Sequence, residues 1–496
     1  MKARTLTCVA SAMLAGVALA SQTEVLFFFD TEDFTNPRSD DGAKEIADLM
    51  NEMGLTGHFA VVGRVAEALE KRGRWDVIDA MKPHLFAGHT WDHSVHPNLC
   101  ERTDIADYAA AFADVDSRER KTMSLIQSVF GAQKVYGAVP PGNSDSYVAM
   151  YAYSAMGVEF YCGPWFFGDD PEDIWLCNMR MLPYNAPFEW LMEPDCSNDP
   201  NDPYSDRPEG CRTVDGVLDH VAKWKRAVFY LHPNKIHSLE FADVLNYKGY
   251  NRHPDEKWEM SPERRPEDVA VYMGRVREIL RRLKTDPRFK ITTLAELAET
   301  TKPRVDITCA DLSSIRSALL EKFAPIHSPA SWSVADVFHA TVKALRGEKV
   351  HRPGRVYGFL EKPRGVSKKT RVSAAGLRTA ASEIDLSTFL PPVISVDGQE
   401  IGPADFLFAA LEVLVAGASE VVVEPRQQMP GYELLPRLEN ICLRNTWMHS
   451  PDLKDKYLSD RMRLQLWTMR KEGVDPKDSR ETCEPPHMLP CRGSPR

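Results

Sequence analysis

Short apolar runs alternate with helical patterns along residues 24–300. The first run, Val25–Phe29, predicts a buried strand, and the apolar spacing over Ala43–Met53 predicts a helix after it. The same alternation gives further expected strands at His58–Val62, Leu85–Ala87, Val135–Ala138, Val158–Cys162, Ala227–Leu231 and Phe289–Thr292, and further expected helices at Val65–Lys71, Ile105–Phe130, Tyr147–Met156, Pro266–Leu283 and from Leu294. Repeated strand-helix units form mostly parallel sheets, so the sequence predicts an α/β fold, either a closed barrel or an open sheet. In both, the carboxyl ends of the strands carry the chemistry.

A basic and then apolar stretch opens the chain. Lys2 and Arg4 precede the apolar residues Leu6–Ala20, which end in small residues before Ser21. This order predicts a signal peptide over residues 1–20 that is cleaved after Ala20. A membrane anchor is the alternative, but the stretch is shorter than a spanning helix, and no later segment is long and apolar enough to span. We therefore expect a secreted or periplasmic protein without a transmembrane segment.

Export makes the cysteines informative. Of the ten cysteines, Cys8 would leave with the signal peptide, so nine remain in a compartment where disulfides persist. Cys196 with Cys211, and Cys483 with Cys491, are close enough in sequence to close short loops. An odd number leaves at least one thiol unpaired or joined to another chain, and the sequence does not fix the connectivity.

The charge of the chain bears on its partners. The net charge is −10, and the basic residues are scattered along the sequence. A nucleic-acid-binding protein normally shows a basic surface, so no nucleic-acid partner is expected. A hydrophobic fraction of 43% with 27% charged residues is ordinary for a soluble globular protein, and 496 residues allow about two to four domains. None of these properties indicates an oligomeric state.

The pattern changes beyond Thr300, where helical segments are joined by basic and proline-containing connectors. Residues 333–345 and 402–414 resemble each other, including an Ala-Asp step at Asp336 and Asp405. The similarity indicates either a duplicated module or two amphipathic helices that start alike. The mature chain is therefore predicted to contain an α/β domain over residues 22–300, a smaller, mainly helical region over residues 301–474 and a polar, proline-rich tail over residues 475–496.

Three acidic residues, Asp30, Glu32 and Asp33, directly follow the first predicted strand. Acids at the end of an apolar strand are costly to bury unless they are used or cap the next helix. If the chain stays extended, Asp30 and Glu32 point to the same side. One could then act as a base while the other binds a metal. The nearby residues Asp40–Gly42 follow a polar loop instead of a strand, so they indicate a helix start.

Two histidines, His89 and His93, follow the predicted strand at Leu85–Ala87. Residues at i and i+4 can face one ion when the backbone is helical, and imidazole is a common metal ligand. His96 makes a three-histidine site possible, whereas Pro97 favours a turn there. Each histidine could instead be a hydrogen-bonded structural residue, but the spaced pair after a strand favours metal binding.

A further histidine, His232, lies at the end of the predicted strand Ala227–Leu231. A histidine in this position is well placed to protonate a leaving group.

In this order, the elements resemble the polysaccharide deacetylase family, the NodB-homology domain of carbohydrate esterase family 4. That family opens with a strand ending in an Asp pair or an Asp-x-Asp variant, and Phe29–Glu32 is similar, with Glu in the second position. His89 and His93 match the family's His-x-x-x-His metal motif, and Leu231–Pro233 matches its final histidine motif. The similarity also includes Leu49–Gly63 and Phe289–Leu297, so it covers residues 24–300, a little over half of the chain.

The resemblance implies an irregular (β/α) barrel and a metal-dependent hydrolase that removes acetyl groups from a polysaccharide or cell-wall glycan. Glu32, His89 and His93 would hold a divalent cation, with zinc expected, that polarises the acetyl carbonyl. Asp30 would take a proton from the attacking water, and His232 would give one to the departing sugar amine or hydroxyl. Asp33 is the alternative to Glu32 as a ligand, and both N-acetyl and O-acetyl groups stay open as substrates.

One motif departs from the family pattern. After the mid-domain strand the family usually has an arginine that orients the catalytic aspartate, whereas this chain has Val139. A glycan- or cell-wall-binding protein that has kept the fold is therefore an alternative, with the repeated region supplying attachment. Hydrolysis of a cyclic amide by a relative of this fold is a third possibility, and it fits a cytoplasmic enzyme better. Trp91, Trp165 and Phe166 are candidates to contact a sugar, although such side chains more often serve packing.

Overall fold

The computed structural model describes residues 22–164, 173–191, 208–246, 257–301, 303–328, 330–431, 435 and 449–472. Outside these ranges lie the expected signal peptide, the tail, the two aromatic residues Trp165 and Phe166, and three cysteines of the expected disulfides, Cys196, Cys483 and Cys491. No disulfide joins two cysteines within the described ranges. In the same part of the chain, no helix is both long and apolar enough to cross a membrane.

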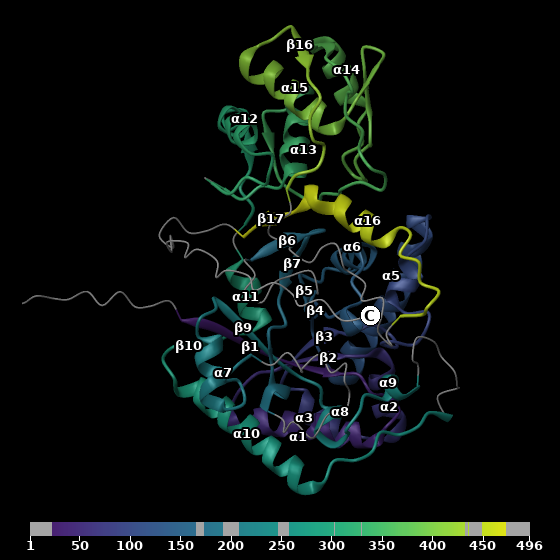
Figure 1. Cartoon of the computed structure of the whole chain (residues 1–496), viewed down its shortest axis with the longest axis vertical. Coiled ribbons are helices and arrows are strands. Elements are labelled where there is room, and N and C mark those ends of the chain that lie inside the picture. Colours follow the sequence, from purple (N-terminus) through teal and green to yellow (C-terminus); the bar gives the residue numbers. More distant parts are fainter. Residues whose placement is uncertain are drawn as a thin grey trace, which may run out of the picture.

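An eleven-stranded sheet forms the core of the lower lobe in Figure 1. Its order is β17-β6-β7-β5-β4-β3-β2-β1-β9-β8, and β10 also pairs with β1. The strands are β1 Thr23–Thr31, β2 His58–Val61, β3 Leu85–Gly88, β4 Val135–Ala138, β5 Phe160–Cys162, β6 Ile174–Leu176, β7 Met179–Leu182, β8 Ala186–Pro187, β9 Arg226–Leu231, β10 Phe289–Ile291 and β17 Arg470–Lys471. Neighbours from β8 through β1 to β7 are parallel, whereas β6 is antiparallel to both β7 and β17. The predicted, mostly parallel α/β sheet is confirmed.

The strand pairing shows that the sheet is curled, since β7 and β8 are close in the chain but pair at distant places in the strand order. β7 pairs with β5, whereas β8 pairs with β9. Asn185, just before β8, holds this segment to β9: its side chain donates to the Arg226 carbonyl at 3.0 Å and accepts from the Val228 amide at 2.8 Å. The predicted barrel-like architecture is confirmed as a curled, mostly parallel sheet with helices around it (Figure 1).

The first strand is buried on both faces, as its unbroken apolar sequence predicts. Val25, Phe27 and Phe29 pack in the large cluster that includes the surrounding helices, whereas Leu26 and Phe28 pack with residues of other strands in a separate cluster. This alternation is the two-residue period of a strand. Asp30 continues it on the side of Leu26 and Phe28, so its carboxylate reaches the end of the curled sheet's interior.

Eleven helices surround this sheet within the described residues: α1 Pro37–Met53, α2 Gly63–Arg72, α3 Trp75–Met81, α4 Leu99–Thr103, α5 Tyr108–Phe130, α6 Tyr147–Ala155, α7 Val214–Val221, α8 Asn234–His237, α9 Ala242–Asn246, α10 Pro266–Thr285 and α11 Leu294–Thr300. The expectation that α1 starts at Asp40–Gly42 is wrong. Asn36 caps the helix by accepting from the Arg38 amide, with a proline in the first turn. Gly42 instead allows close packing, because a Cβ there would lie 2.2 Å from the Pro233 carbonyl oxygen.

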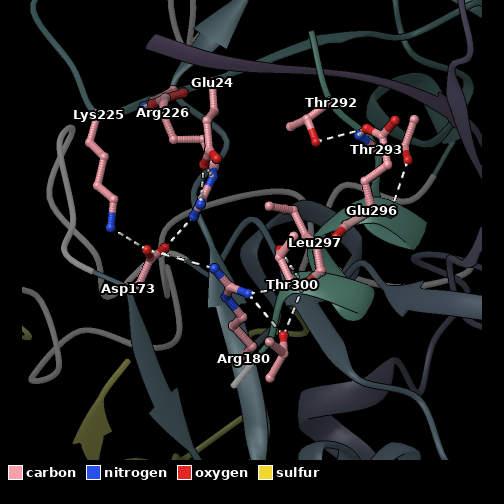
Figure 2. A network of polar contacts seen from close by, with 12 residues as sticks. Glu24, Asp173, Arg180, Lys225, Arg226, Thr292, Thr293, Glu296, Leu297 and Thr300 are labelled. Carbon is pink, nitrogen blue, oxygen red and sulfur yellow. Dashed lines mark hydrogen bonds and ion pairs between the residues drawn. The ribbon is translucent and has the colours of Figure 1, made fainter. Parts of the chain in front are cut away.

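A buried ion network joins the amino ends of β1, β7 and β9 (Figure 2). Asp173 binds the guanidinium of Arg226, lies 3.7 Å from that of Arg180 and contacts the Lys225 ammonium at 2.5 Å. Arg226 also donates to Glu24 on β1 at 3.1 Å. Basic residues at the starts of β7 and β9 thus meet at one buried carboxylate.

A second apolar core lies in the upper lobe of Figure 1 and is formed mainly by residues 307–423. Its helices and strands are β11 Ile307–Thr308, α12 Leu312–Glu321, α13 Val334–Leu345, β12 Val350–His351, β13 Thr370–Ser373, α14 Ala374–Glu383, β14 Ile394–Val396, β15 Gln399–Ile401, α15 Pro403–Ala416 and β16 Glu420–Val423. Two helices lie between an antiparallel pair of strands in both halves: β11 pairs with β12 and β13 with β16, and the second half has the extra antiparallel pair β14 and β15 between its helices. Asp336 and Asp405 have the same position in α13 and α15, where each accepts from the amide of the residue before the helix at 2.9 Å.

The segment 449–472 returns from this second core to the large sheet. It contains α16 Leu458–Arg463, and β17 at its end pairs with β6. Trp467 packs in the second core, whereas Leu466 packs in the large cluster of the first. The segment therefore connects both cores.

Two buried histidines in the second core predict a pH-dependent stability. The rings of His339 on α13 and His351 on β12 lie 5.9 Å apart. Burial, together with the nearby charges of Lys343 and Arg304, lowers the pKa of each to about 4 despite the opposing charge of Asp336. Between pH 6.5 and about 4 the unfolded chain therefore binds protons that the folded chain does not. Lowering the pH through this window should reduce the free energy of unfolding by about 1.4 kcal/mol per pH unit for each histidine.

The repeat supplies a matched variant for this prediction. His339 lies six residues after the start position Ser333, and Phe408 lies six residues after Gly402. We expect His339→Phe to weaken the pH dependence in urea unfolding followed by tryptophan fluorescence, since Trp332 and Trp467 are buried in this core. Equal slopes in the variant and the parent chain would contradict the role of His339.

Candidate metal centre

Two acids at the carboxyl end of β1 begin the site. Asp30 and Glu32 are both buried. The Tyr184 hydroxyl donates to Asp30 Oδ1 at 3.1 Å, and His232 Nε2 lies 3.7 Å from Asp30 Oδ2. Burial raises the pKa of the Asp30 carboxyl, although positive charge on His89 and His232 opposes this shift. The buried Asp30 carboxylate therefore accepts from a neutral hydroxyl and faces a histidine.

Glu32, His89 and His93 converge on one point, with one potential ligand atom of each lying within 4.8 Å of the others. Glu32 Oε2 is 3.6 Å from His89 Nε2 and 3.1 Å from His93 Nε2. Asn234 donates to the other oxygen, Oε1, at 3.3 Å, which turns Oε2 toward the histidines. All three members are buried, and a carboxylate with two imidazoles is a donor set that suits a divalent transition metal.

The protonation of His89 fits such a centre. Its Nδ1 lies 3.0 Å from the Val139 carbonyl oxygen, which can only accept, so Nδ1 carries the hydrogen. Nε2 is then the nitrogen with a lone pair, and this buried atom has no hydrogen-bond partner among the described residues. A bound cation would explain why this buried nitrogen points at two other potential ligand atoms.

The backbone of residues 90–93 is a turn, so the two histidines face each other without the helical backbone that a spacing of four residues would ordinarily need. Thr90 has φ 63° and His93 has φ 54°, both left-handed. The amides of Gly63 and Arg64 at the start of α2 donate to the carbonyls of Thr90 and Trp91 at 3.0 and 2.9 Å. These bonds hold a conformation that β-branched Thr90 rarely adopts, and such strain is often found at functional sites.

Two candidate ligands from the sequence do not join the group. His96 Nδ1 is bound to Glu101 at 2.8 Å. Asp33 accepts from the Thr35 amide at 2.9 Å and from the Ser39 hydroxyl at 2.8 Å, so it closes the turn before α1. Of the two adjacent acids, the structure thus brings Glu32, and not Asp33, to the histidines.

His232 is fixed by a second acid. Glu189 Oε1 accepts from the His232 amide at 3.0 Å and from its ring nitrogen Nδ1 at 2.9 Å. Burial alone would lower the pKa of His232, but the charges of Glu32 and Glu189 outweigh it and raise the pKa to about 9. The ring therefore carries a proton at neutral pH and directs Nε2 toward Asp30.

Side chains that the sequence patterns did not single out complete the centre: Tyr184, Glu189, Asn234 and Asp243. Asn234 follows the His232-Pro233 pair directly, and that proximity was the one available signal. Val139, where the family has an arginine, contributes its carbonyl to His89, while Tyr184 donates to Asp30.

Trp91 is half-buried against the Lys121 ammonium and Gly63, which fits the packing role. A hollow borders the centre and is lined by Glu32, Phe34, His93, Asp243 and Trp258 among others.

Comparisons with known proteins give a likeness in structure. No family model matches the chain, and no curated protein matches it. A mutant of the peptidoglycan deacetylase PdaC from Bacillus subtilis is 13% identical, and the match covers 60% of this chain and 97% of that chain with a TM-score of 0.29. A CE4 family pseudoenzyme from Bacillus anthracis is 13% identical, and the match covers 43% of this chain and 55% of that chain with a TM-score of 0.25. A 4-alpha-glucanotransferase from Thermococcus litoralis is 12% identical, and the match covers 57% of this chain and 41% of that chain with a TM-score of 0.38. At these TM-scores the overlap is partial.

Proposed function

We propose that this chain is a hydrolase that depends on a divalent cation, with zinc expected, and removes acetyl groups from a polysaccharide or cell-wall glycan. The observation that carries the proposal is the convergence of Glu32, His89 and His93 next to Asp30 and His232. Charge supports it as well. Four carboxylates, those of Asp30, Glu32, Glu189 and Asp243, surround three histidines, and a cation would balance the excess of negative charge.

Different residues of the chain carry out different steps of the proposed hydrolysis. When bound by Glu32, His89 and His93, a cation would supply charge stabilisation at the acetyl carbonyl. Asp30, held by Tyr184, takes a proton from the attacking water as the new bond between oxygen and carbon forms. His232 Nε2 gives a proton to the departing amine or hydroxyl as the bond to the acetyl carbon breaks. Glu189 keeps Nδ1 of His232 occupied, so that Nε2 is the nitrogen that serves the leaving group.

The place of action is part of the proposal. A signal peptide over residues 1–20 would bring the chain to a secreted or periplasmic compartment, where acetylated glycans of cell walls and biomass are accessible. The N-terminal sequence supports this expectation.

The test combines cation content with acetate release. We expect the purified chain to hold a divalent cation and to release acetate from one or more members of a panel of N- and O-acetylated glycans. His89→Ala should lose both properties. His96→Ala is the matched control, because this neighbouring histidine is bound to Glu101 outside the group. A chain without a cation, whose acetate release survives His89→Ala, would refute the proposal.

A glycan- or wall-binding protein is the second candidate. It is favoured by Val139 in place of the family's arginine and by the twofold repeat of strands and helices in residues 307–423. Glycan binding that is unchanged by a chelator, without acetate release from any substrate of the panel, would support it. Measurable acetate release would exclude a binding protein without activity.

A further inference from the structure

His93 is bound at both ring nitrogens. Nε2 faces Glu32 Oε2 at 3.1 Å within the metal centre, whereas Nδ1 lies 3.0 Å from Asp243 Oδ2 on α9. The Ser94 hydroxyl donates to the same Asp243 oxygen at 2.6 Å. A carboxylate oxygen accepts and does not donate, so Nδ1 of His93 carries the hydrogen, and the lone pair of Nε2 is directed to the cation position.

Asp243 therefore lies behind a ligand and is not itself one of the converging atoms. It is absent from the group whose ligand atoms approach within 4.8 Å, although the described residues include it. The two nitrogens of an imidazole ring face different directions, so a carboxylate on Nδ1 cannot reach an ion at Nε2. We infer that Asp243 is a positioning residue that orients His93 and strengthens it as a ligand of the cation. This inference rests on the cation site of the proposed function, but not on acetate release.

The two histidines of the centre differ in the partner behind each ring. His89 donates from Nδ1 to the neutral carbonyl of Val139, whereas His93 donates to a carboxylate. A carboxylate behind an imidazole raises the basicity of the opposite nitrogen and fixes the ring orientation. His93 is then the stronger donor of the pair, and its strength depends on a residue 150 positions away.

Hydrogen bonds and packing hold the segment around Asp243 in place. Its other oxygen accepts from the Val244 amide at 2.9 Å, and Asn246 at the end of α9 exchanges hydrogen bonds with the Glu259 backbone at 3.0 and 2.9 Å. Just before α9, the Phe241 ring packs edge-on against His232 at 5.0 Å. The short segment Phe241–Asn246 thus contacts both a candidate ligand and the candidate acid.

Burial makes the carboxylate costly without its partners. Asp243 is 8% exposed. A buried ionised group is unfavourable unless it is hydrogen-bonded, and here the donors are the His93 ring, the Ser94 hydroxyl and an amide. A need for the negative charge of Asp243 behind the His93 ring explains why an acid, and not an amide, occupies this position.

The experiment measures zinc affinity of the full mature chain by competition with a chromophoric chelator. We expect Asp243→Asn to weaken zinc binding by about 10- to 100-fold and Asp243→Ala by at least as much, because Asn keeps an acceptor for Nδ1 but loses the charge. Ser94→Ala, which removes the second donor to Asp243, should weaken binding less. Glu45→Gln is the matched control, since it removes a carboxylate from a histidine outside the centre, His237.

Further readouts separate positioning from general stability. If Asp243 acts through the cation, saturating zinc should restore most of the acetate release of Asp243→Asn, and the metal-free variant should unfold at the same temperature as the metal-free parent. The inference would be overturned if both Asp243 variants bound zinc as tightly as the parent chain. If Asp243→Ala does not fold, parent-like zinc affinity in Asp243→Asn and Ser94→Ala would overturn it instead. A parent chain that binds zinc with an affinity that depends on Asp243 but releases no acetate would instead refute the proposed hydrolase and leave the role of Asp243 standing.

Discussion

Replacing His232 with asparagine is expected to slow acetate release by about 10²- to 10⁴-fold while the chain keeps its cation. Asparagine cannot supply a proton to the leaving group, whereas His232 is held protonated by neighbouring acids, with its pKa raised to about 9 against the effect of burial. His232 is not among the converging ligand atoms, so cation content should not change. Steady-state acetate release and elemental analysis of the same preparations measure both quantities.

A neighbouring histidine provides the control for this prediction. His237 on α8 is also bound to a carboxylate, that of Glu45, at 3.0 Å, but it lies outside the centre. His237→Asn should retain the acetate release of the parent chain. An unchanged rate in His232→Asn would show that another group protonates the product, and loss of the cation from that variant would make His232 a ligand.

The sequence predicted the residues at the ends of the strands better than it predicted their partners. Asp30, Glu32, His89, His93 and His232 each follow an apolar run, and parallel strands bring such ends together. Their partners come from distant segments: Tyr184 lies 154 positions from Asp30, and Asp243 lies 150 positions from His93. No local pattern marks these side chains, because they are selected by the curl of the sheet and by the path of the chain after β9.

Local backbone conformation explains where the structure departs from these patterns. Residues four apart face one ion on a helix, but at His89 and His93 left-handed φ angles at Thr90 and His93 produce the convergence in a turn. Asp40–Gly42 looked like a helix start, but Asn36 and the proline after it offered a stronger capping signal three residues earlier.

Replacing Asp173 with asparagine is expected to destabilise the folded chain by about 3–5 kcal/mol. Asp173 and Glu24 offset two of the three positive charges of Arg180, Lys225 and Arg226 (Figure 2). Asp173, Arg180 and Arg226 are all less than 10% exposed, so the variant would leave buried guanidinium groups without their central carboxylate. The midpoint of urea unfolding of the sheet measures the change. The exposed pair Arg277 and Glu52 gives the control, because Glu52→Gln should leave the midpoint nearly unchanged.

The difference in stability between the parent chain and Asp173→Asn should depend on pH if its origin is electrostatic. Burial would raise the pKa of the Asp173 carboxyl, but the charges of Arg226, Arg180 and Lys225 outweigh it and hold the pKa below the usual 3.8. An acid whose folded-state pKa is lowered contributes its stability above its unfolded-state pKa and loses it as the pH falls toward the folded-state value. The gap between the parent chain and Asp173→Asn should therefore be full at neutral pH and shrink below about pH 3.8. A gap that is independent of pH would assign the effect to packing, and the network would then add little through its charges.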